Sequence, residues 1–508
     1  MPRISLQFYT RELKVIDGNE GVWEPLKYGT SAKINYFRLQ GNPDYFYVER
    51  FKLLLDPTNT QAVPLPPGVT LAKVMCDFLA YMKSTAEDII KHHQGHNNDP
   101  VQWVVTVPAI WSPTAKAKTR QACFDCGMID SLESSKLLLC YEPQAASIFI
   151  QKNSPFMAPN DVVVTLDIGG GTTDITSHEA GSVHIDKAFL DFVQRLVGPE
   201  CYQTVLAKNS QIALKLISSF EPQKRLLTKD DFDNDYCFAS IDIPSEIYSE
   251  MSLMQKSLIK QREYQHGCDD KIELTAEEMA SFFDPVIDTV IYELEQYFEK
   301  LIFKGKRPTK LLIVGGLAGC PYLAERVRDT FGQKYKIGIT IPPDPGSAIL
   351  KGAADFGFNP GKVSRRIWSH SYYLLYSKAY DPQTETPPPN RKIYKQPPNY
   401  YYEDYFEITT AGEEMPLNHK VPVPVLSPSD SSKTVRFQLL RQVSTDMMMK
   451  VALSCVLKVP PAYIRPGHNN TFRVEIIFHP TEVILQVYHV DSKSYLSGDS
   501  VIWEDEKL

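Results

Sequence analysis

Apolar residues recur along this chain at two spacings, one helical and one typical of strands. Within residues 69–93 they recur every three or four positions, as at Leu71 and Val74, which predicts an amphipathic helix. From about residue 101 to residue 357, short apolar runs of strand length alternate with helical stretches. This alternation predicts a parallel or mixed sheet with helices on its faces. Beyond residue 361 prolines and tyrosines become frequent and the helical spacing is lost, so we expect a small all-β domain there.

Local signals predict individual elements within these regions. Apolar runs rich in β-branched residues predict strands at residues 103–107, 137–140, 162–166 and 310–314 in the α/β region, and at 435–440, 449–457, 471–478 and 482–489 in the all-β region. A long helical stretch is expected from residue 189 to residue 220. The segment Thr-Ala-Glu-Glu at residues 275–278 has the spacing of a capping box and predicts a helix that runs to about residue 303.

The charge balance and the cysteines narrow the class of protein. A formal net charge of -7 over 508 residues offers no basic surplus for a nucleic-acid backbone, so we expect no nucleic-acid partner. No apolar run reaches the length of a membrane span, and the first residues lack the apolar core of a signal peptide, so no membrane association is expected. The nine cysteines are scattered, which suits a reducing compartment. We therefore expect a cytoplasmic protein, with a nuclear location also open.

A glycine-rich turn at residues 167–174 carries the sharpest chemical signal. The segment reads Asp-Ile-Gly-Gly-Gly-Thr-Thr-Asp and directly follows a predicted strand. Successive glycines allow a tight hairpin whose backbone N–H groups approach a phosphate without Cβ clashes. Asp167 and Asp174 bracket the turn and suit Mg²⁺ beside phosphates. The candidate phosphate-binding residues between them are Gly169, Gly170, Gly171, Thr172 and Thr173. The alternative is a structural turn with two solvated acids.

A second pair of glycines, Gly315 and Gly316, follows the strand predicted at residues 310–314, and Pro321 then opens a helix. A strand, two glycines and a helix N-terminus form a surface where a base or a ribose can approach the backbone. We expect this corner and the glycine turn to face each other across one cleft and to hold a nucleotide from two sides.

These motifs together resemble the actin-like ATPase superfamily, and most closely the seventy-kilodalton heat-shock chaperone family (heat shock protein 70). Three further segments carry the resemblance: Val-Thr-Val-Pro-Ala at residues 105–109, Tyr-Glu-Pro-Gln-Ala-Ala at 141–146, and Gly-Ala-Ala at 352–354. The resemblance covers roughly residues 45–357. The last two segments match the family's two interlobe segments.

The resemblance implies an α/β fold, namely an actin-like (ribonuclease H-like) two-lobed nucleotide-binding domain followed by a small β-rich C-terminal domain. Residues 1–160 would form the remainder of the first lobe, residues 161–360 the second lobe, and residues 361–508 the C-terminal domain. The implied ligands are ATP or ADP and Mg²⁺, and the implied partners are unfolded or specific protein clients. The family also implies a role in the stress response.

The resemblance also assigns roles to individual residues. Asp167, Asp174 and Glu142 would coordinate Mg²⁺ through water. Asp167 and Glu142 are also catalytic candidates. Lys52 is the candidate for the catalytic lysine that faces the phosphates, although Arg50 is close enough to compete and a lysine on a helix surface is the plain alternative.

The residues Glu221, Lys224 and Arg225 have the E-x-x-K-R spacing of the family's adenosine-contacting helix. There the acid holds the ribose, and the lysine and the arginine flank the base. The alternative reading is an exposed helix face of mixed charge.

Four departures from the family pattern affect the functional prediction. No DxGTT-like first phosphate loop precedes Gly29, which leaves two explanations, a pseudo-ATPase or an incomplete gene product. The segment after Asp174 is short, and Leu317 and Gly319 replace polar or arginine contacts in the adenosine motif. The C-terminal region lacks a helical lid, which resembles the divergent, lidless branch of the family.

Three functions remain open from the sequence. The first is a divergent chaperone-family protein that binds ATP or ADP with Mg²⁺ and whose hydrolysis is weak or lost. The second is a nucleotide-free pseudo-ATPase scaffold that presents the C-terminal β domain to a partner. The third is a small-molecule kinase of the same superfamily, which would need an acid placed as a base for the acceptor hydroxyl. Whether the protein is an enzyme stays open.

Overall fold

The computed structural model of the chain describes these residues: 6–12, 22–38, 42, 44–55, 65–92, 101–132, 134–153, 157–158, 160–169, 173–174, 181–209, 211–233, 237–262, 270–363, 365–367, 371–387, 389, 391–396, 399–416, 419–422, 434–442, 449–458, 472–478, 483–490, 493–495 and 501–504. The chain divides into two compact units. The first, here called the body, comprises Met1–Thr85, Pro108–Ile110 and Tyr141–Phe358. The second, here called the β-rich unit, comprises Ala86–Val107, Trp111–Cys140 and Asn359–Leu508.

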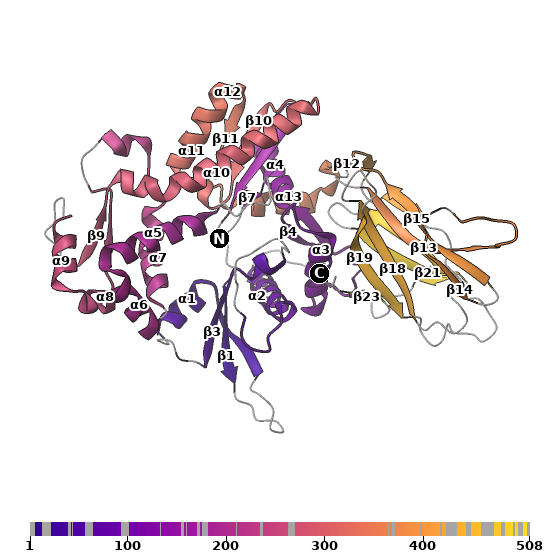
Figure 1. Cartoon of the computed structure of the whole chain (residues 1–508), viewed down its shortest axis with the longest axis horizontal. Helices are drawn as coiled ribbons and strands as arrows, with labels where there is room; N and C mark the ends of the chain where they lie inside the picture. Colours follow the sequence, from indigo (N-terminus) through magenta and orange to yellow (C-terminus); the bar gives the residue numbers. More distant parts are fainter. Residues whose placement is uncertain are drawn as a thin grey trace. The chain divides into compact units, whose positions relative to one another are not determined.

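The central sheet of the body has the strand order β11 (Gly338–Thr340), β10 (Lys310–Val314), β6 (Val163–Ile168) and β7 (Thr173–Asp174). The strands β6, β10 and β11 run parallel, and β7 folds back antiparallel to β6. The strands β10 and β11 lie among the helices of the body in Figure 1. Alternate residues of β6, among them Val164 and Leu166, point into the main hydrophobic core of the body. Thr165 lies on the other face, where its hydroxyl is 3.2 Å from that of Ser147 in α4 (Glu142–Asn153). The sheet is therefore covered by helices on both faces, as the alternating pattern predicts.

The helices that enclose the core are contributed mainly by the chain after β7. They are α5 (Ser182–Val197), α6 (Pro199–Lys208), α7 (Ile212–Gln223), α8 (Ser245–Glu250), α9 (Leu253–Lys260), α10 (Ala276–Phe303), α11 (Pro321–Val327) and α12 (Gln333–Tyr335). The helix α13 (Ala348–Phe358) packs instead against α4. Short helical turns lie at η2 (Lys229–Asp233), η3 (Leu317–Gly319) and η4 (Arg328–Gly332), the last of which is π-helical. A separate antiparallel pair is formed by β8 (Ala239–Asp242) and β9 (Lys271–Leu274).

Two helix predictions have different outcomes. The capping box is confirmed, because the Thr275 hydroxyl accepts a hydrogen bond from the Glu278 N–H at 3.2 Å and the Glu278 carboxylate accepts one from the Thr275 N–H at 3.2 Å. The single long helical stretch from residue 189 to residue 220 is wrong. The structure has three helices there, because Gly198 has a φ of +91°, outside the helical region, and Pro199 then starts a new helix.

The first residues of the body form a three-stranded antiparallel sheet in the order β2 (Val22–Tyr28), β1 (Leu6–Glu12) and β3 (Tyr45–Glu49). The helix α1 (Gly29–Arg38) follows β2, and the short turn η1 (Phe51–Leu55) follows β3. The amphipathic helix predicted at residues 69–93 is confirmed as α2 (Leu71–His92).

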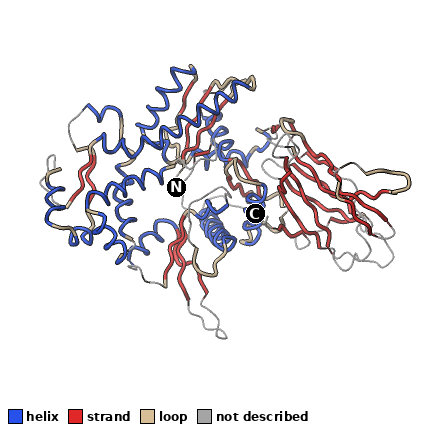
Figure 2. The backbone as a smooth tube through the Cα atoms, viewed as in Figure 1, coloured by secondary structure: helices blue, strands red, loops and turns tan. Residues whose placement is uncertain are grey.

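The β-rich unit contains two larger sheets. One has the order β14 (Ile393–Gln396), β15 (Asn399–Thr409), β13 (Tyr372–Tyr380), β18 (Thr434–Gln442), β19 (Met449–Lys458) and β23 (Val501–Glu504). The other has the order β17 (His419–Pro422), β20 (Phe472–Phe478), β21 (Val483–His489) and β22 (Ser494–Tyr495). Smaller elements are α3 (Pro113–Asp125), the pair β4 (Trp103–Val107) and β5 (Leu137–Tyr141), the pair β12 (Arg365–Ile367) and β16 (Glu414–Pro416), and the turn η5 (Pro360–Lys362). Figure 2 shows strands joined by loops in this part of the chain, and from residue 371 onward the described elements are all strands, as the sequence predicts.

Candidate nucleotide site

The glycine turn is a β-hairpin at the carboxyl end of β6. In the pairing of β6 with β7, Asp167 lies directly opposite Asp174 and Ile168 lies opposite Thr173. The predicted hairpin with an aspartate at each end is therefore confirmed at the level of the backbone. Gly170, Gly171 and Thr172 lie outside the described residues, and the side chains of Thr173 and Asp174 are likewise not described.

The Gly315–Gly316 corner lies beside this hairpin. β10 pairs with β6 so that Val314 is opposite Asp167, which brings the carboxyl ends of the two strands to the same edge of the sheet. A Cβ added to Gly315 would lie 2.3 Å from the carbonyl oxygen of Ile168 and 2.4 Å from Oδ1 of Asp167. The expectation that turn and corner face each other across a cleft is wrong, because neighbouring parallel strands put them side by side. Ligands of open α/β sheets bind beyond this edge.

Glu142 and Lys52 form an ion pair within the body. Nζ of Lys52 lies 2.5 Å from Oε1 of Glu142, which is the first residue of α4. The Glu142 side chain is 12% exposed, whereas that of Lys52 is 40% exposed, so the pair is open to solvent from the lysine side. Arg50, the competing cation, has a φ of +57° and lies 3.8 Å from Glu49. The structure thus brings together two of the three catalytic candidates.

The two segments that match interlobe segments of the resembled family lie against each other. A Cβ added to Gly352 in α13 would lie 1.7 Å from the carbonyl oxygen of Ala145 in α4, so the two helix backbones are in direct contact there. An ion pair of 2.5 Å between Lys152 and Asp355 also joins these helices. This crossing fixes α4, and with it Glu142, relative to α13.

The E-x-x-K-R residues lie at the carboxyl end of α7. The side chain of Lys224 is only 1% exposed, and its ammonium lies 2.6 Å from Glu221 and 2.7 Å from Asp186 in α5. It also donates a hydrogen bond of 2.7 Å to the hydroxyl of Ser182. Arg225 pairs with Glu221 at 2.7 Å. The reading as an exposed helix face does not hold for Lys224, because its charge is buried.

The environment of this cluster shifts two carboxyl groups in opposite directions. Burial raises the pKa of Asp186, against the opposing attraction of Lys224. Burial would also raise the pKa of Glu221, but the ion pairs with Lys224 and Arg225 outweigh it and hold that pKa below its ordinary value. Sequence reasoning missed Ser182 and Asp186. Their spacing of four residues, which puts both on one face of a helix, was the available signal.

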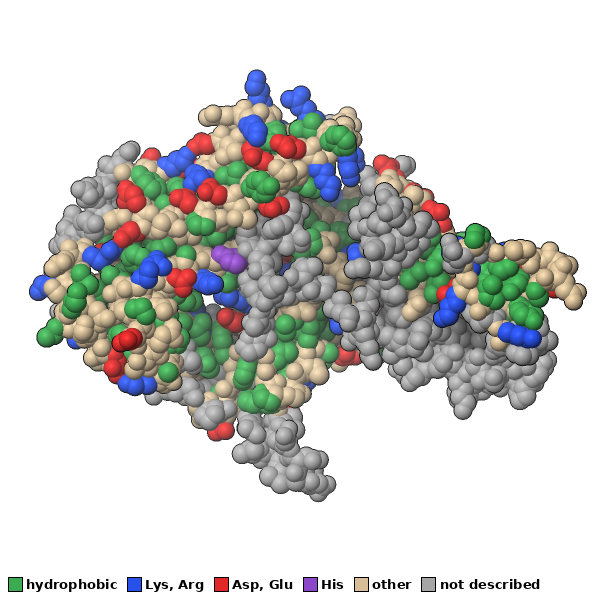
Figure 3. All heavy atoms as spheres, in the orientation of Figure 1, with side chains coloured by type: hydrophobic (Ala, Val, Ile, Leu, Met, Phe, Trp, Pro, Cys, Tyr) green, Lys and Arg blue, Asp and Glu red, His purple; other side chains and the backbone are tan. Residues whose placement is uncertain are grey.

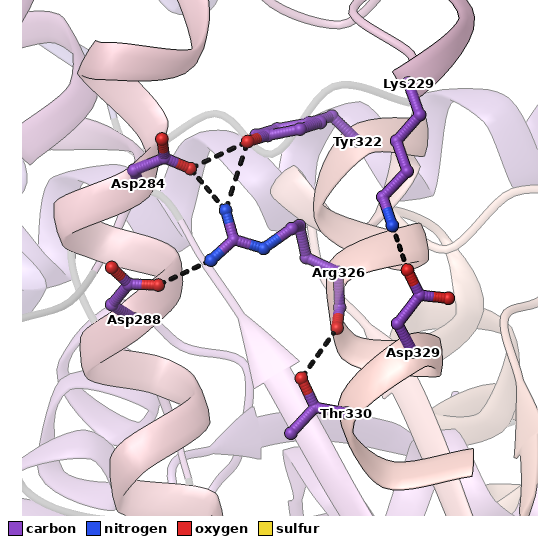
Figure 4. A network of polar contacts seen from close by, with 7 residues as sticks. All are labelled: Lys229, Asp284, Asp288, Tyr322, Arg326, Asp329 and Thr330. Carbon is purple, nitrogen blue, oxygen red and sulfur yellow. Dashed lines mark hydrogen bonds and ion pairs between the residues drawn. The ribbon is translucent and has the colours of Figure 1, made fainter. Parts of the chain in front are cut away.

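The segment that follows α7 is joined to the helix that follows the glycine corner. The N–H of Tyr322 in α11 donates to the carbonyl oxygen of Leu227 at 2.9 Å. Behind this contact, Arg326 of α11 binds two carboxylates of α10, Asp284 at 2.5 Å and Asp288 at 2.6 Å (Figure 4). The Tyr322 hydroxyl donates to Asp284 at 2.8 Å in the same network. The glycine corner and the E-x-x-K-R motif therefore sit on elements that are bonded to each other.

The donors available for a metal ion are carboxylates. Asp167 is 4% exposed and Glu142 is the first residue of α4. Within the described part of the chain, no three His, Cys, Asp or Glu side chains gather so as to hold a metal ion. A few carboxylates together with water and phosphate oxygens are the usual ligands of Mg²⁺, so the donor chemistry fits Mg²⁺ carried by a nucleotide.

Figure 3 shows Lys and Arg side chains interspersed with Asp and Glu side chains on the face of the body that it displays. Among the described helices, none combines the length and the apolar character needed to cross a membrane.

Comparisons with known proteins agree with this geometry. Residues 66–192 match the family model "Hsp70 protein". The chain is 25% identical over 424 residues to heat shock 70 kDa protein 12A of Homo sapiens, and the aligned region covers 67% of this chain and 62% of that protein. It is 22% identical over 473 residues to heat shock 70 kDa protein 12B of Homo sapiens, which covers 76% of this chain and 68% of that protein. It is 24% identical over 292 residues to the chaperone protein DnaK of Thermoplasma acidophilum, which covers 53% of this chain and 41% of that protein. The fold of the body is the actin-like α/β fold.

Proposed function

Because the chain is a divergent relative of the heat-shock protein 70 family, we propose that its body binds ATP or ADP together with Mg²⁺ and that its hydrolysis of ATP is weak or lost. The observation that carries this proposal is the shared edge of β6 and β10. There the Asp167 hairpin and the Gly315 corner lie in direct contact, and the segment after α7 is hydrogen-bonded to the helix that follows the corner.

Each part of this edge has a different role in the proposal. The glycine hairpin offers backbone N–H groups to the phosphates, as glycine-rich turns do. A Cβ added to Gly316 would meet no atom within 4 Å, so its backbone is open to a base or a ribose. The carboxylates of Asp167 and Glu142 would hold Mg²⁺ through its water ligands, and Mg²⁺ when bound neutralises phosphate charge. Lys52 stands beside Glu142 as the cation for the phosphates.

Weak hydrolysis is supported by how the candidate cation of the body is bound. Phosphoryl transfer depends on positioning and on stabilising the developing charge. The candidate cation, Lys52, is already paired with Glu142. Removing one such source of charge stabilisation costs roughly two orders of magnitude in rate. A site of this kind binds nucleotide more readily than it turns it over.

Isothermal titration of the full chain with Mg²⁺ and ADP tests binding. We expect saturable binding below about 1 mM, and a weakening of at least about tenfold in Asp167→Asn, since a hydrogen bond to a charged group contributes about 1.5–3 kcal/mol. Asp161→Asn is the matched control, because Asp161 precedes β6 at its opposite, amino end and binds Thr309 at 2.7 Å. An absence of heat from the unmodified chain, or equal weakening by both variants, rejects the proposal.

The alternative function is a nucleotide-free scaffold that presents the β-rich unit to a partner. It is favoured by the internal pairing of both candidate cations, Lys52 with Glu142 and Lys224 with Asp186. A ligand that binds only the folded state must raise the melting temperature. A melting temperature that does not change with ATP, ADP and Mg²⁺ supports the scaffold. With either function, we propose that the protein binds protein clients and is cytoplasmic.

A further inference from the structure

Lys224 has no donor left for a ligand. A lysine ammonium carries three N–H bonds. Three oxygen atoms surround it: Oε2 of Glu221 at 2.6 Å, Oδ1 of Asp186 at 2.7 Å and Oγ of Ser182 at 2.7 Å. The Lys224 side chain is also only 1% exposed, so bulk water does not reach these bonds. A nucleotide could bond to Lys224 only by displacing one of these three partners.

One of these partners reaches the glycine hairpin. Ser182 is the first residue of α5, and its backbone N–H donates to the carbonyl oxygen of Gly169 at 3.4 Å. Gly169 follows β6 directly and opens the turn of the hairpin. A continuous polar path thus runs from Glu221 at the end of α7, through Lys224 and Ser182, to the start of the hairpin. This path joins the two surfaces assigned above to the adenosine and to the phosphates.

The charges along this path balance. Asp186 and Glu221 supply two negative charges, and Lys224 and Arg225 supply two positive charges. Removing one member of a buried ion pair strongly destabilises the folded protein, because an uncompensated charge is left in the interior. Burial of the ammonium among fixed partners therefore makes this a rigid connection between α5 and α7 rather than a mobile ligand arm.

We propose that Ser182 and Asp186 are positioning residues of the nucleotide site, which hold Lys224 as an internal tie between the end of α7 and the start of the glycine hairpin. The tie sets how far the adenosine surface lies from the phosphate surface, and so selects a ligand that spans both, an adenosine diphosphate or triphosphate. Lys224 acts through Glu221 and Ser182 and does not itself touch the ligand. This inference rests on the proposed function of the body.

Substitutions of Ser182 in the full chain test the tie by titration with Mg²⁺ and ADP. Ser182→Ala removes the hydroxyl that accepts from Lys224, whereas Ser182→Thr keeps it. We expect Ser182→Ala to weaken ADP binding about tenfold, the cost of a hydrogen bond to a charged group. Ser182→Thr should restore the affinity to within about twofold of the unmodified chain. Rescue by the hydroxyl is a result that general loss of packing does not produce.

Asp186→Asn supplies a second measurement, and Glu246→Gln is its matched control. Glu246 pairs with Lys215 at 2.6 Å, so this control also removes a carboxylate bound to a lysine of α7, but Lys215 has no part in the path to Gly169. Asp186→Asn should weaken ADP binding about tenfold, and the control should not.

The outcomes separate the two proposals. If the unmodified chain binds ADP and neither Ser182→Ala nor Asp186→Asn weakens it, the tie is rejected and the proposed function stands. If Ser182→Thr binds as weakly as Ser182→Ala, the role of the hydroxyl is rejected. If the unmodified chain does not bind ADP, both proposals are rejected. Should Asp186→Asn fail to fold, the two Ser182 variants decide the question alone.

Discussion

Replacing Gly315 and Gly316 one at a time by alanine separates a requirement of packing from a requirement of ligand access. The two glycines are adjacent, and alanine adds one methyl group in each case. Gly315 has a φ of +104°, and its added Cβ would meet Ile168 O at 2.3 Å and Asp167 Oδ1 at 2.4 Å. Gly316 has helical angles, φ −64° and ψ −36°, and its added Cβ would meet no atom within 4 Å.

These values predict different changes in the free energy of unfolding. A non-glycine residue held at a positive φ costs about 1–3 kcal/mol, and overpacking in a filled region costs about 1–3 kcal/mol more. Gly315→Ala should therefore destabilise the body by about 2–6 kcal/mol. Gly316→Ala should change stability by less than about 1 kcal/mol, with a small gain favoured because alanine restricts the unfolded chain.

Thermal unfolding and titration with Mg²⁺ and ADP measure the two effects separately. Gly315→Ala should lower the melting temperature by at least about 4 °C, since one kcal/mol shifts the midpoint of a large domain by about 2 °C or more. Gly316→Ala should keep the melting temperature and weaken ADP binding about tenfold, because its methyl group occupies the space proposed for the ligand. An unchanged melting temperature for Gly315→Ala refutes the packing argument. Undiminished ADP binding by Gly316→Ala refutes the proposed ligand position.

Three further changes test the fold and its charges. Gly352→Ala should destabilise the body by at least about 1–3 kcal/mol in denaturant unfolding, because its methyl group would overlap the carbonyl oxygen of Ala145; an unchanged midpoint contradicts the helix contact. The hydrogen bond from Lys215 lowers the pKa of Glu246 below its ordinary value of 4.5. The ion pair therefore stabilises the folded protein at neutral pH, and this stabilisation is lost as the pH falls through the lowered pKa. Glu246→Gln removes it. For so exposed a pair we expect no more than about 1 kcal/mol at pH 7, and a difference between the two proteins that grows in acid contradicts the sign. Arg326→Lys should cost about 1–2 kcal/mol in the same unfolding assay, because a lysine cannot hold two carboxylates in a fork; unchanged stability contradicts that role.

The elements predicted correctly from the sequence have signals that are local. The helix α10 starts at a capping box, and β6 and β10 are short apolar runs that directly precede glycines. The strands β13 and β15 were not predicted, because tyrosines stand on both faces of each, as at Tyr372 and Tyr373. Since period-two alternation is the strand signal, a run that is aromatic at consecutive positions hides it.

The site was predicted as a set of motifs but not as an arrangement. The hairpin register could be anticipated, because a glycine turn after a strand returns the chain onto that strand. The tie at Lys224 could not be anticipated from the sequence, because its partners Ser182 and Asp186 lie 42 and 38 residues away along the chain. Only the packing of α5 against α7 decides which face of α5 meets that ammonium.

The side-by-side placement of hairpin and corner changes where the second side of the nucleotide site must come from. Two neighbouring parallel strands offer one continuous edge, so together they contact a ligand from one side only. The opposing contacts must then come from elements outside this sheet. The ion pair of Lys52 with Glu142 is one charged group outside this sheet, since Lys52 lies in η1 and Glu142 begins α4. If this ion pair supplies the second side of the site, Glu142 competes with the phosphates for Lys52. In the same way, Lys52 competes with Mg²⁺ for the Glu142 carboxylate. Glu142→Gln should then remove this competing ion pair and tighten ADP binding in the absence of Mg²⁺, while weakening the gain that Mg²⁺ produces. Equal effects with and without Mg²⁺ would place the second side elsewhere.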